Sequence, residues 1–154
     1  MFTNGKINPG HAGDMLSDKS WQYLPAAYVA GLLMMNIVSI PFGTYSMIEE
    51  CPDDTWNCDK IDLDISVPES ELHAAMEEWA NERSFTTTFN EGHIVDRTPF
   101  MQFPDDVIYV YECGSLELLS QSRIGQGDMG VNSDRLDDIK QFLEEYDFSE
   151  IGCQ

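Results

Sequence analysis

The residues best suited to chemistry form a set of carboxylates, arginines and one asparagine in the second half of the chain. Paired carboxylates beside an arginine can perform general acid–base catalysis when burial shifts the pKa of one of them. No cysteine or serine stands beside a matched histidine, and we expect His73 and His93 to be structural or exposed. We therefore favour a structural role, in which Arg123 and Asp128 tie a loop to a sheet by charge-assisted hydrogen bonds. The set comprises Asp96, Arg97, Asp105, Asp106, Arg123, Asp128, Asn132 and Arg135.

A glycine-rich segment, Gly125-Gln-Gly127-Asp-Met-Gly130, has the spacing of a dinucleotide-binding loop. In that fold the next helix must return to a parallel strand that carries an acidic residue about 20 positions later. Too few residues follow the last expected helix for this crossover, and Asp128 would repel a pyrophosphate. We therefore expect the three glycines to permit a loop, with Asn132 capping the helix that follows.

Four cysteines raise the question of metal binding or disulfides. Cys51 and Cys58 flank a short polar loop. Their spacing exceeds that of common zinc sites and no histidine lies nearby, so we predict a disulfide between them. The sequence leaves open whether Cys113 and Cys153 pair or remain buried thiols. No metal site is predicted, since the acidic residues at 59–64 lack the glycine of an EF-hand loop.

The elements that must position these residues lie between 61 and 146. Strict alternation over 61–65 predicts a strand, and Pro68 opens a helix with Leu72, Met76 and Trp79 on its inner face. Short strands are expected around 85–89, 93–95, 107–111 and 116–119, followed by a helix from about 133 to 146. Consecutive strands joined by tight turns imply an α+β domain, a small antiparallel sheet with two packed helices.

An uncharged stretch between Lys19 and Glu49 precedes this domain. Its apolar residues occupy every helical face, which is typical of a helix surrounded by lipid. Trp21 and Tyr23 at one end and Tyr45 at the other resemble the aromatic belts of membrane interfaces. We predict one N-terminal transmembrane helix within 20–43.

Two alternatives to a transmembrane helix stay open. A cleaved signal peptide is disfavoured, because 19 residues precede the apolar run and no small-residue cleavage site follows it. A buried helix of a soluble domain is kept open by two polar residues, Asn36 and Ser39. Asn36 is a candidate ligand for a pigment magnesium, although a hydrogen bond to a neighbouring helix is the favoured role.

Charged residues are distributed unevenly along the chain. It holds 28 acidic and 8 basic residues, and the whole net charge of −20 lies beyond residue 43. Such a surface repels phosphate backbones, so a nucleic-acid partner is excluded.

We expect a polar N-terminal arm (1–19), the transmembrane helix (20–43), a linker with the disulfide loop (44–60) and an acidic α+β domain (61–154). Lys6 and Lys19 place the N-terminus in the cytoplasm or stroma by the positive-inside rule, and the domain in a periplasm or thylakoid lumen.

Three segments carry a family resemblance: Arg97-Thr-Pro-Phe-Met-Gln-Phe-Pro-Asp-Asp-Val107, Ser122-Arg-Ile-Gly-Gln-Gly-Asp-Met-Gly-Val-Asn132 with Arg135, and Cys51-Pro-Asp-Asp with Asn57-Cys58. Together they resemble the domain of unknown function 1499 family over about residues 51–145. The departures are one extra residue between the first two cysteines, Asp59-Lys60, and Ser133 where a basic residue is common. The resemblance implies an occurrence in bacteria and plastid-bearing eukaryotes, often behind a membrane segment, and it brings no established activity.

These observations favour a non-catalytic, single-pass membrane accessory subunit. Its acidic domain is expected to bind or stabilise a larger membrane protein complex, and the family's occurrence suggests a photosystem. Partners would be the subunits of that complex and the lipid bilayer, with no cofactor beyond chlorophyll or lipid contacts along the helix. The competing functions are a binding module for a small apolar ligand, pigment or lipid, and a carboxylate-dependent hydrolase-like enzyme.

Overall fold

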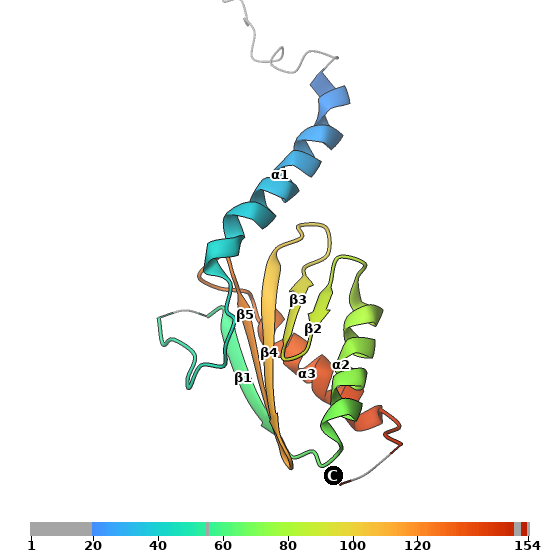
Figure 1. The fold of residues 1–154 in the computed structure, drawn as a ribbon. Coiled ribbons are helices and arrows are strands. Elements are labelled where there is room, and N and C mark those ends of the chain that lie inside the picture. The colour runs from blue at the N-terminus through green and yellow to red at the C-terminus, as the bar shows by residue number, and fades with distance from the viewer. Residues whose placement is uncertain (1–19, 55, 150–151, 154) are drawn as a thin grey trace, which may run out of the picture.

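Five antiparallel strands form one sheet in the order β1-β5-β4-β3-β2, in the computed structural model of residues 20–54, 56–149 and 152–153 (Figure 1). Short connections join β2 to β3, β3 to β4 and β4 to β5, so neighbours in sequence pair in space. The predicted α+β class is confirmed. The elements are α1 (Leu24–Ser39), β1 (Cys58–Leu63), α2 (Glu69–Arg83), β2 (Thr88–Asn90), β3 (His93–Arg97), β4 (Pro104–Glu112), β5 (Ser115–Ser122) and α3 (Val131–Glu145), with short 3-10 turns on either side of α1.

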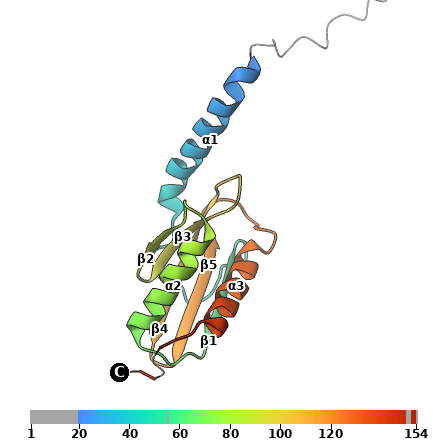
Figure 2. The ribbon, with the colours of Figure 1, turned by 90° about the vertical axis from the view of Figure 1, so that its right-hand side faces the viewer.

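Helices α2 and α3 cover one face of this sheet (Figure 2). Apolar residues three or four positions apart on each helix point at the strands, as an amphipathic helix requires. On α2 these include Leu72, Met76 and Trp79, and on α3 Leu136 and Ile139, all buried. Side chains of β4 and β5 complete the core from the other side, so the space between helices and sheet is filled.

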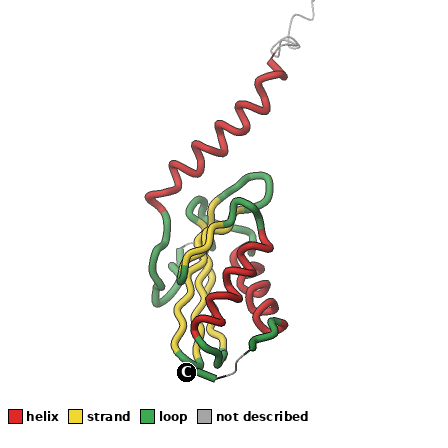
Figure 3. The backbone as a smooth tube through the Cα atoms, turned by 45° about the vertical axis from the view of Figure 1, so that its right-hand side comes forward, coloured by secondary structure: helices red, strands yellow, loops and turns green. Residues whose placement is uncertain are grey.

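The opposite face of the sheet is crossed by the chain that leaves α1 (Figure 3). The backbone N–H of Thr44 donates to Asp106 Oδ2 at 2.8 Å, and its hydroxyl donates to Gln121 Oε1 at 2.7 Å. Further along, Lys60 Nζ donates to the carbonyl oxygen of Ile48. The linker is thus attached to β4, β5 and β1.

Both pairs of cysteines form disulfides. Cys51 bonds to Cys58, as predicted, and Cys113 bonds to Cys153, the pairing that the sequence left open. The second bond joins residues 40 positions apart and ties the end of the chain to the turn between β4 and β5. Two disulfides are typical of a protein from an oxidising compartment.

Helix α1 extends away from the end of the sheet (Figure 1). The helical segment Trp21–Phe42 is 22 residues long with a mean hydropathy of 1.6, which is long and apolar enough to span a bilayer. Almost all of this surface is exposed rather than packed inside the chain. A core helix of a soluble domain would be covered, so the exposed surface favours the membrane interpretation.

One narrow face of α1 does contact the domain. Leu32, Met35, Asn36 and Ser39 are less exposed than their neighbours, with the spacing of one helical stripe. Asn36 Oδ1 accepts a hydrogen bond from Arg97 Nε at 2.9 Å, and its Nδ2 donates to the carbonyl oxygen of Gln102. Asn36 therefore faces the chain's own domain, whereas the buried hydroxyl of Ser39 donates to the Asn36 carbonyl oxygen within the helix at 2.8 Å.

Several predicted boundaries differ from the structure. Strand β1 begins at Cys58 instead of residue 61, and β2 covers only the end of the predicted 85–89 strand. Helix α3 begins at Val131, after Gly130 at φ +88°, so the prediction that Asn132 caps it is wrong. Asn132 already lies inside the first turn, and its side chain turns to the sheet. The predicted polar arm, 1–19, lies outside the described residues.

Candidate functional site

Strand geometry separates the two adjacent aspartates of β4. Successive side chains of a strand point to opposite faces, so Asp105 faces the helices and Asp106 faces the linker. Asp96 of β3 lies directly opposite Asp105, on the same face. The candidate residues therefore form two clusters. We call them the inner cluster (Asp96, Asp105, Ser120, Asn132, Arg135) and the outer cluster (Thr44, Tyr45, His93, Asp106, Arg123).

Arg135 organises the inner cluster from helix α3. Its Nε donates to Asp96 Oδ2 at 2.9 Å and its Nη2 to Asp105 Oδ2 at 2.6 Å. The remaining nitrogen, Nη1, donates to Ser120 Oγ at 2.9 Å and to Asn132 Oδ1 at 3.0 Å. Because the side chains of Arg135 and both aspartates are at most 3% exposed, one guanidinium joins two carboxylates of neighbouring strands away from water.

The two inner carboxylates respond differently to this environment. Burial acts to raise the pKa of Asp96, but attraction and hydrogen bonds from Arg135, with support from Arg83 and Thr87, outweigh it and hold that pKa below 3.8. For Asp105, burial outweighs Arg135 and raises the pKa above 3.8. The pair has the unequal acidities that acid–base chemistry needs. Both members are enclosed, however, which leaves no room for a substrate between them.

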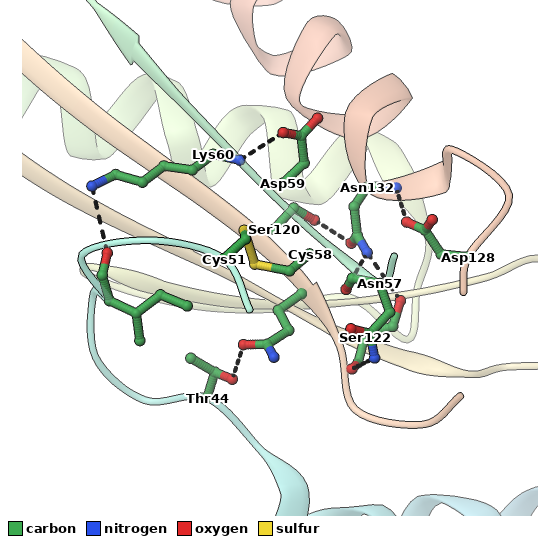
Figure 4. The surroundings of a disulfide bond; sticks show 12 residues. Thr44, Cys51, Asn57, Cys58, Asp59, Lys60, Ser120, Ser122, Asp128 and Asn132 are labelled. Atoms are coloured by element: carbon green, nitrogen blue, oxygen red, sulfur yellow. Dashed lines mark hydrogen bonds between the residues drawn. A yellow bond between two sulfur atoms is a disulfide. The ribbon is translucent and has the colours of Figure 1, made fainter. Parts of the chain in front are cut away.

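Asn132 links three elements through its side chain (Figure 4). Its Oδ1 accepts a hydrogen bond from Ser120 Oγ at 2.7 Å. Its Nδ2 donates to the carbonyl oxygen of Asn57 at 2.7 Å and to Ser122 Oγ at 3.2 Å. The first turn of α3 is thereby fixed to β5 and to the disulfide loop.

The outer cluster is centred on Asp106. Arg123 binds it with two parallel hydrogen bonds, Nε to Oδ2 at 2.8 Å and Nη2 to Oδ1 at 2.6 Å. His93 Nε2 lies 2.7 Å from Oδ1, and the ring of Tyr45 packs against both His93 and Arg123. Burial acts to raise the pKa of Asp106, but hydrogen bonds from His93, Arg123 and the Thr44 N–H lower it overall. Asp106 thus fastens the linker to the sheet.

The glycine-rich loop lies against the disulfide loop. Gly125 has φ +104°, a conformation that favours glycine, and its carbonyl oxygen accepts from Asn57 Nδ2 at 2.8 Å. The N–H of Trp56 donates to the carbonyl oxygen of Gln126 at 2.9 Å. A nearby parallel bridge joins Trp56 to Gly127. The loop is held by backbone contacts, a structural role for its glycines.

Asp128 acts inside this loop rather than toward the sheet. Its Oδ1 accepts from the N–H of Gly130 at 3.0 Å and its Oδ2 from the N–H of Asn132 at 2.6 Å. The expected partnership with Arg123 is not formed, because Arg123 is engaged by Asp106. Asp128 instead satisfies free N–H groups at the start of α3, the task of a capping residue.

Replacing Asp128 with alanine is expected to lower the free energy of unfolding by about 1 kcal/mol, the usual effect of losing a helix cap. Urea unfolding followed by circular dichroism would measure the change. Asp128→Asn retains an acceptor and should recover most of it. An alanine variant as stable as the original protein would contradict the capping role.

The lowered pKa values of Asp96 and Asp106 predict acid sensitivity. A carboxyl with a folded pKa below its unfolded value stabilises the protein above the unfolded pKa, and this contribution disappears as the pH falls through the folded pKa. For Asp96 and Asp106, this stabilising contribution begins to fall when the pH drops below 3.8, the ordinary pKa of an aspartate. Asp106→Asn should therefore be less stable than the original near neutral pH, and the difference should shrink as the pH falls below that value. Urea midpoints across this range would test it, and a constant difference would contradict it.

The three groups that a hydrolase would bring together do not converge. Asp96 lies on the helix-covered face, Arg123 on the opposite face and Asp128 in the glycine loop. Within the described ranges, no group of three or more histidine, cysteine or acidic side chains is placed to hold a metal ion. The arrangement can hold segments of the chain together, and the buried charges in it already have partners.

Arg97 differs from the other arginines. It donates from Nε to Asn36 and from Nη1 to the carbonyl oxygen of Thr86. In the part of the chain that the structure describes, Arg83, Arg123 and Arg135 each pair with a carboxylate, whereas Arg97 has no such ion pair. Sequence reasoning placed Arg97 with the other candidates but did not anticipate its contact with α1.

A family comparison covers most of this arrangement. The model of a family described as "Protein of unknown function (DUF1499)" matches residues 52–143. The chain belongs to the DUF1499 family. The match runs from the disulfide loop almost to the end of α3. It contains the inner cluster and the Asp106–Arg123 pair, while α1 and the linker residues Thr44 and Tyr45 lie outside it. A search of curated proteins found no match to the chain.

Proposed function

We propose that this DUF1499 protein is a non-catalytic, single-pass membrane subunit whose acidic domain binds and stabilises a larger membrane protein complex. The observation that carries the proposal is α1, an apolar helix exposed on nearly all sides and hydrogen-bonded to the domain near its end. An exposed apolar surface of this size is stable only against lipid or other apolar helices. The domain is thereby held close to the membrane.

The non-catalytic part of the proposal is supported by the two clusters. Each buried carboxylate is bonded to an arginine, and hydroxyl, amide or backbone groups use further acceptor positions. A general base needs a free lone pair within reach of a substrate proton. Among the described residues, side chains fill the core between sheet and helices, and the pocket of about 510 Å³ beside β1 and α3 is open to solvent, which gives the apolar-ligand alternative less support.

Charge and disulfides support a proposal for the domain's side of the membrane. Lys6 and Lys19 precede α1, whereas the net negative charge follows it, which favours an N-terminus in the cytoplasm or stroma. The two disulfides are typical of an oxidising compartment and support placing the domain in one. We therefore place it in a periplasm or thylakoid lumen, and the family's occurrence in plastid-bearing eukaryotes makes a photosystem the host we would test first.

Contacts within such a complex would fall on the free faces of α1. Ala27 and Gly31 are one turn apart, and a side chain added at Gly31 would meet nothing within 4 Å, so a second helix could approach there. Asn36 is no longer a good candidate for a pigment ligand, because Arg97 occupies its Oδ1. Chlorophyll or lipid contacts are expected on the exposed apolar positions instead.

Native electrophoresis after mild detergent extraction would test the proposal. The full chain should remain with the membrane fraction and migrate with an assembly far larger than its own mass, and the pigment of the band would reveal a photosystem. Gly31→Leu should weaken this association, whereas Ile37→Leu, at an exposed position away from the Ala27–Gly31 stripe, is the matched control. Recovery of the intact chain as a monomer without detergent would overturn the proposal.

A further inference from the structure

Two loops lie at the end of the sheet from which α1 extends (Figure 1). Strand pairing places both loops at the same end of the sheet. Arg97, the last residue of β3, pairs with Pro104, the first residue of β4, and β2 begins beside the end of β3. We call them the apex loops: residues 84–87, between α2 and β2, and residues 98–103, between β3 and β4. Both loops line an open groove between the domain and α1.

The apex loops expose large apolar side chains. Phe85 is fully exposed, Phe100 is 84% exposed and Met101 is 51% exposed. Scattered apolar residues are common on protein surfaces, but these three lie on two adjoining loops beside an apolar helix. The apolar surface of α1 therefore continues onto the domain.

Charge sets the apex loops apart from the rest of the domain. Neither loop contains an acidic residue, in a chain that has 28 of them. Arg97, at the base of the second loop, is the arginine without an ion pair among the described residues. Every charged side chain is costly in hydrocarbon, but an arginine near the interface can extend its guanidinium toward lipid phosphates, which would repel a carboxylate.

The backbone of residues 98–103 largely satisfies its own hydrogen bonds. The N–H of Gln102 donates to the Thr98 carbonyl oxygen at 2.9 Å, and the N–H of Thr98 donates to the Phe103 carbonyl oxygen at 3.1 Å. The Thr98 hydroxyl accepts from the N–H of Phe103 at 3.1 Å. Hydrogen bonds inside the loop lower the cost of moving its irregular backbone out of water and toward lipid.

Contacts to α1 fix the height of this loop along the helix. The hydroxyl of Tyr28 donates to the Phe100 carbonyl oxygen, and Asn36 donates to that of Gln102. At 1.5 Å per residue, Tyr28 lies about 20 Å and Asn36 about 9 Å from Phe42, where the apolar segment ends. The loop therefore lies alongside the segment, not beyond its end. An open groove of about 640 Å³ separates the two, lined by Tyr28, Leu32, Leu33, Phe85 and Phe100.

We propose that the apex loops are a second membrane anchor: they enter the bilayer beside residues 28–36 of α1, with Phe85, Phe100 and Met101 among the lipid chains. An acyl chain occupies the groove, and Arg97, bonded to Asn36, lies nearer the headgroups than Phe100 does. This proposal rests on α1 being in the membrane, and it adds that the domain does not hang freely from its helix. Apolar insertion, not net charge, drives the contact, so neutral lipid suffices.

Depth-dependent fluorescence quenching would test the insertion. Phe100→Trp in the full chain, placed in nanodiscs of neutral phosphatidylcholine with brominated acyl chains, should lose several-fold more of its added emission than Val110→Trp. Val110 is also exposed but lies toward the other end of β4, so it is the matched control. Aqueous iodide should give the reverse order, and Phe85→Trp should behave like Phe100→Trp.

The same samples separate this proposal from the one on which it rests. A chain that fails to co-elute with the discs would show that α1 does not enter lipid, which overturns the membrane-subunit proposal. A chain that co-elutes, but whose tryptophans at 85 and 100 are quenched like the one at 110, would overturn the apex anchor alone. Because Phe85 and Phe100 are exposed, neither substitution disturbs the core.

Discussion

Replacement of Arg135 by methionine is expected to lower the free energy of unfolding by about 3–5 kcal/mol, the range for removing one partner of a buried ion pair. The change would leave Asp96 and Asp105 facing each other on adjacent strands, both almost completely buried. It would also remove hydrogen bonds to Ser120 and Asn132, which hold the first turn of α3.

Chemical denaturation of the full chain in detergent would measure this loss. Lys140→Met is the matched control, because Lys140 is an exposed cation on the same helix, and its replacement should change stability by no more than about 0.5 kcal/mol. Arg135→Lys should recover only part of the stability, since an ammonium cannot reproduce the fork between two carboxylates. Equal stability of the methionine and control variants would refute the central role of Arg135.

Replacement of Asp106 by alanine is the second large effect, with an expected loss of about 3 kcal/mol. Arg123 would lose both of its hydrogen bonds to the carboxylate, and His93 its partner at 2.7 Å. The N–H of Thr44 would lose its acceptor as well, so the linker below α1 would lose its attachment to β4, while the bond of the Thr44 hydroxyl to Gln121 remains.

Hydrogen exchange distinguishes this local release from a general loss of stability. The amide of Thr44 should exchange faster in Asp106→Ala than the global change in stability accounts for, while core amides of β5 follow the global change. Asp137→Ala, at an exposed position of α3, should leave both quantities unaltered. If Thr44 keeps its protection, Asp106 does not fasten the linker.

Periodic patterns account for the parts of the fold that could be predicted. The inner face of α2, with Leu72, Met76 and Trp79, follows from helical spacing, and the sheet follows from short strands joined by tight turns. The disulfide between Cys51 and Cys58 follows from a short polar loop whose cysteine spacing exceeds that of common zinc sites and which has no histidine nearby. These features depend on residues close together in the sequence.

The candidate site depends on long-range pairing, which local patterns do not reveal. Asp105 and Asp106 look like one pair in the sequence, yet the pleat sends them to opposite faces, and only the strand register brings Asp96 opposite Asp105. The contact between Arg97 and Asn36 joins segments 61 positions apart. Two polar residues in an apolar helix were a signal that one face of it had a partner, but nothing local identified that partner.

The bond between Cys113 and Cys153 has a mechanical consequence. A pull applied at Cys153 is transmitted to the hairpin of β4 and β5, at the end of the domain away from α1, and not to the last turn of α3 (Figure 1). Helix α3 therefore cannot be peeled from the sheet starting at its C-terminal end while that covalent link persists. After reduction of this disulfide, the same pull would act on the C-terminal end of α3 instead of the β4–β5 hairpin. The helix could then detach from the sheet one turn at a time.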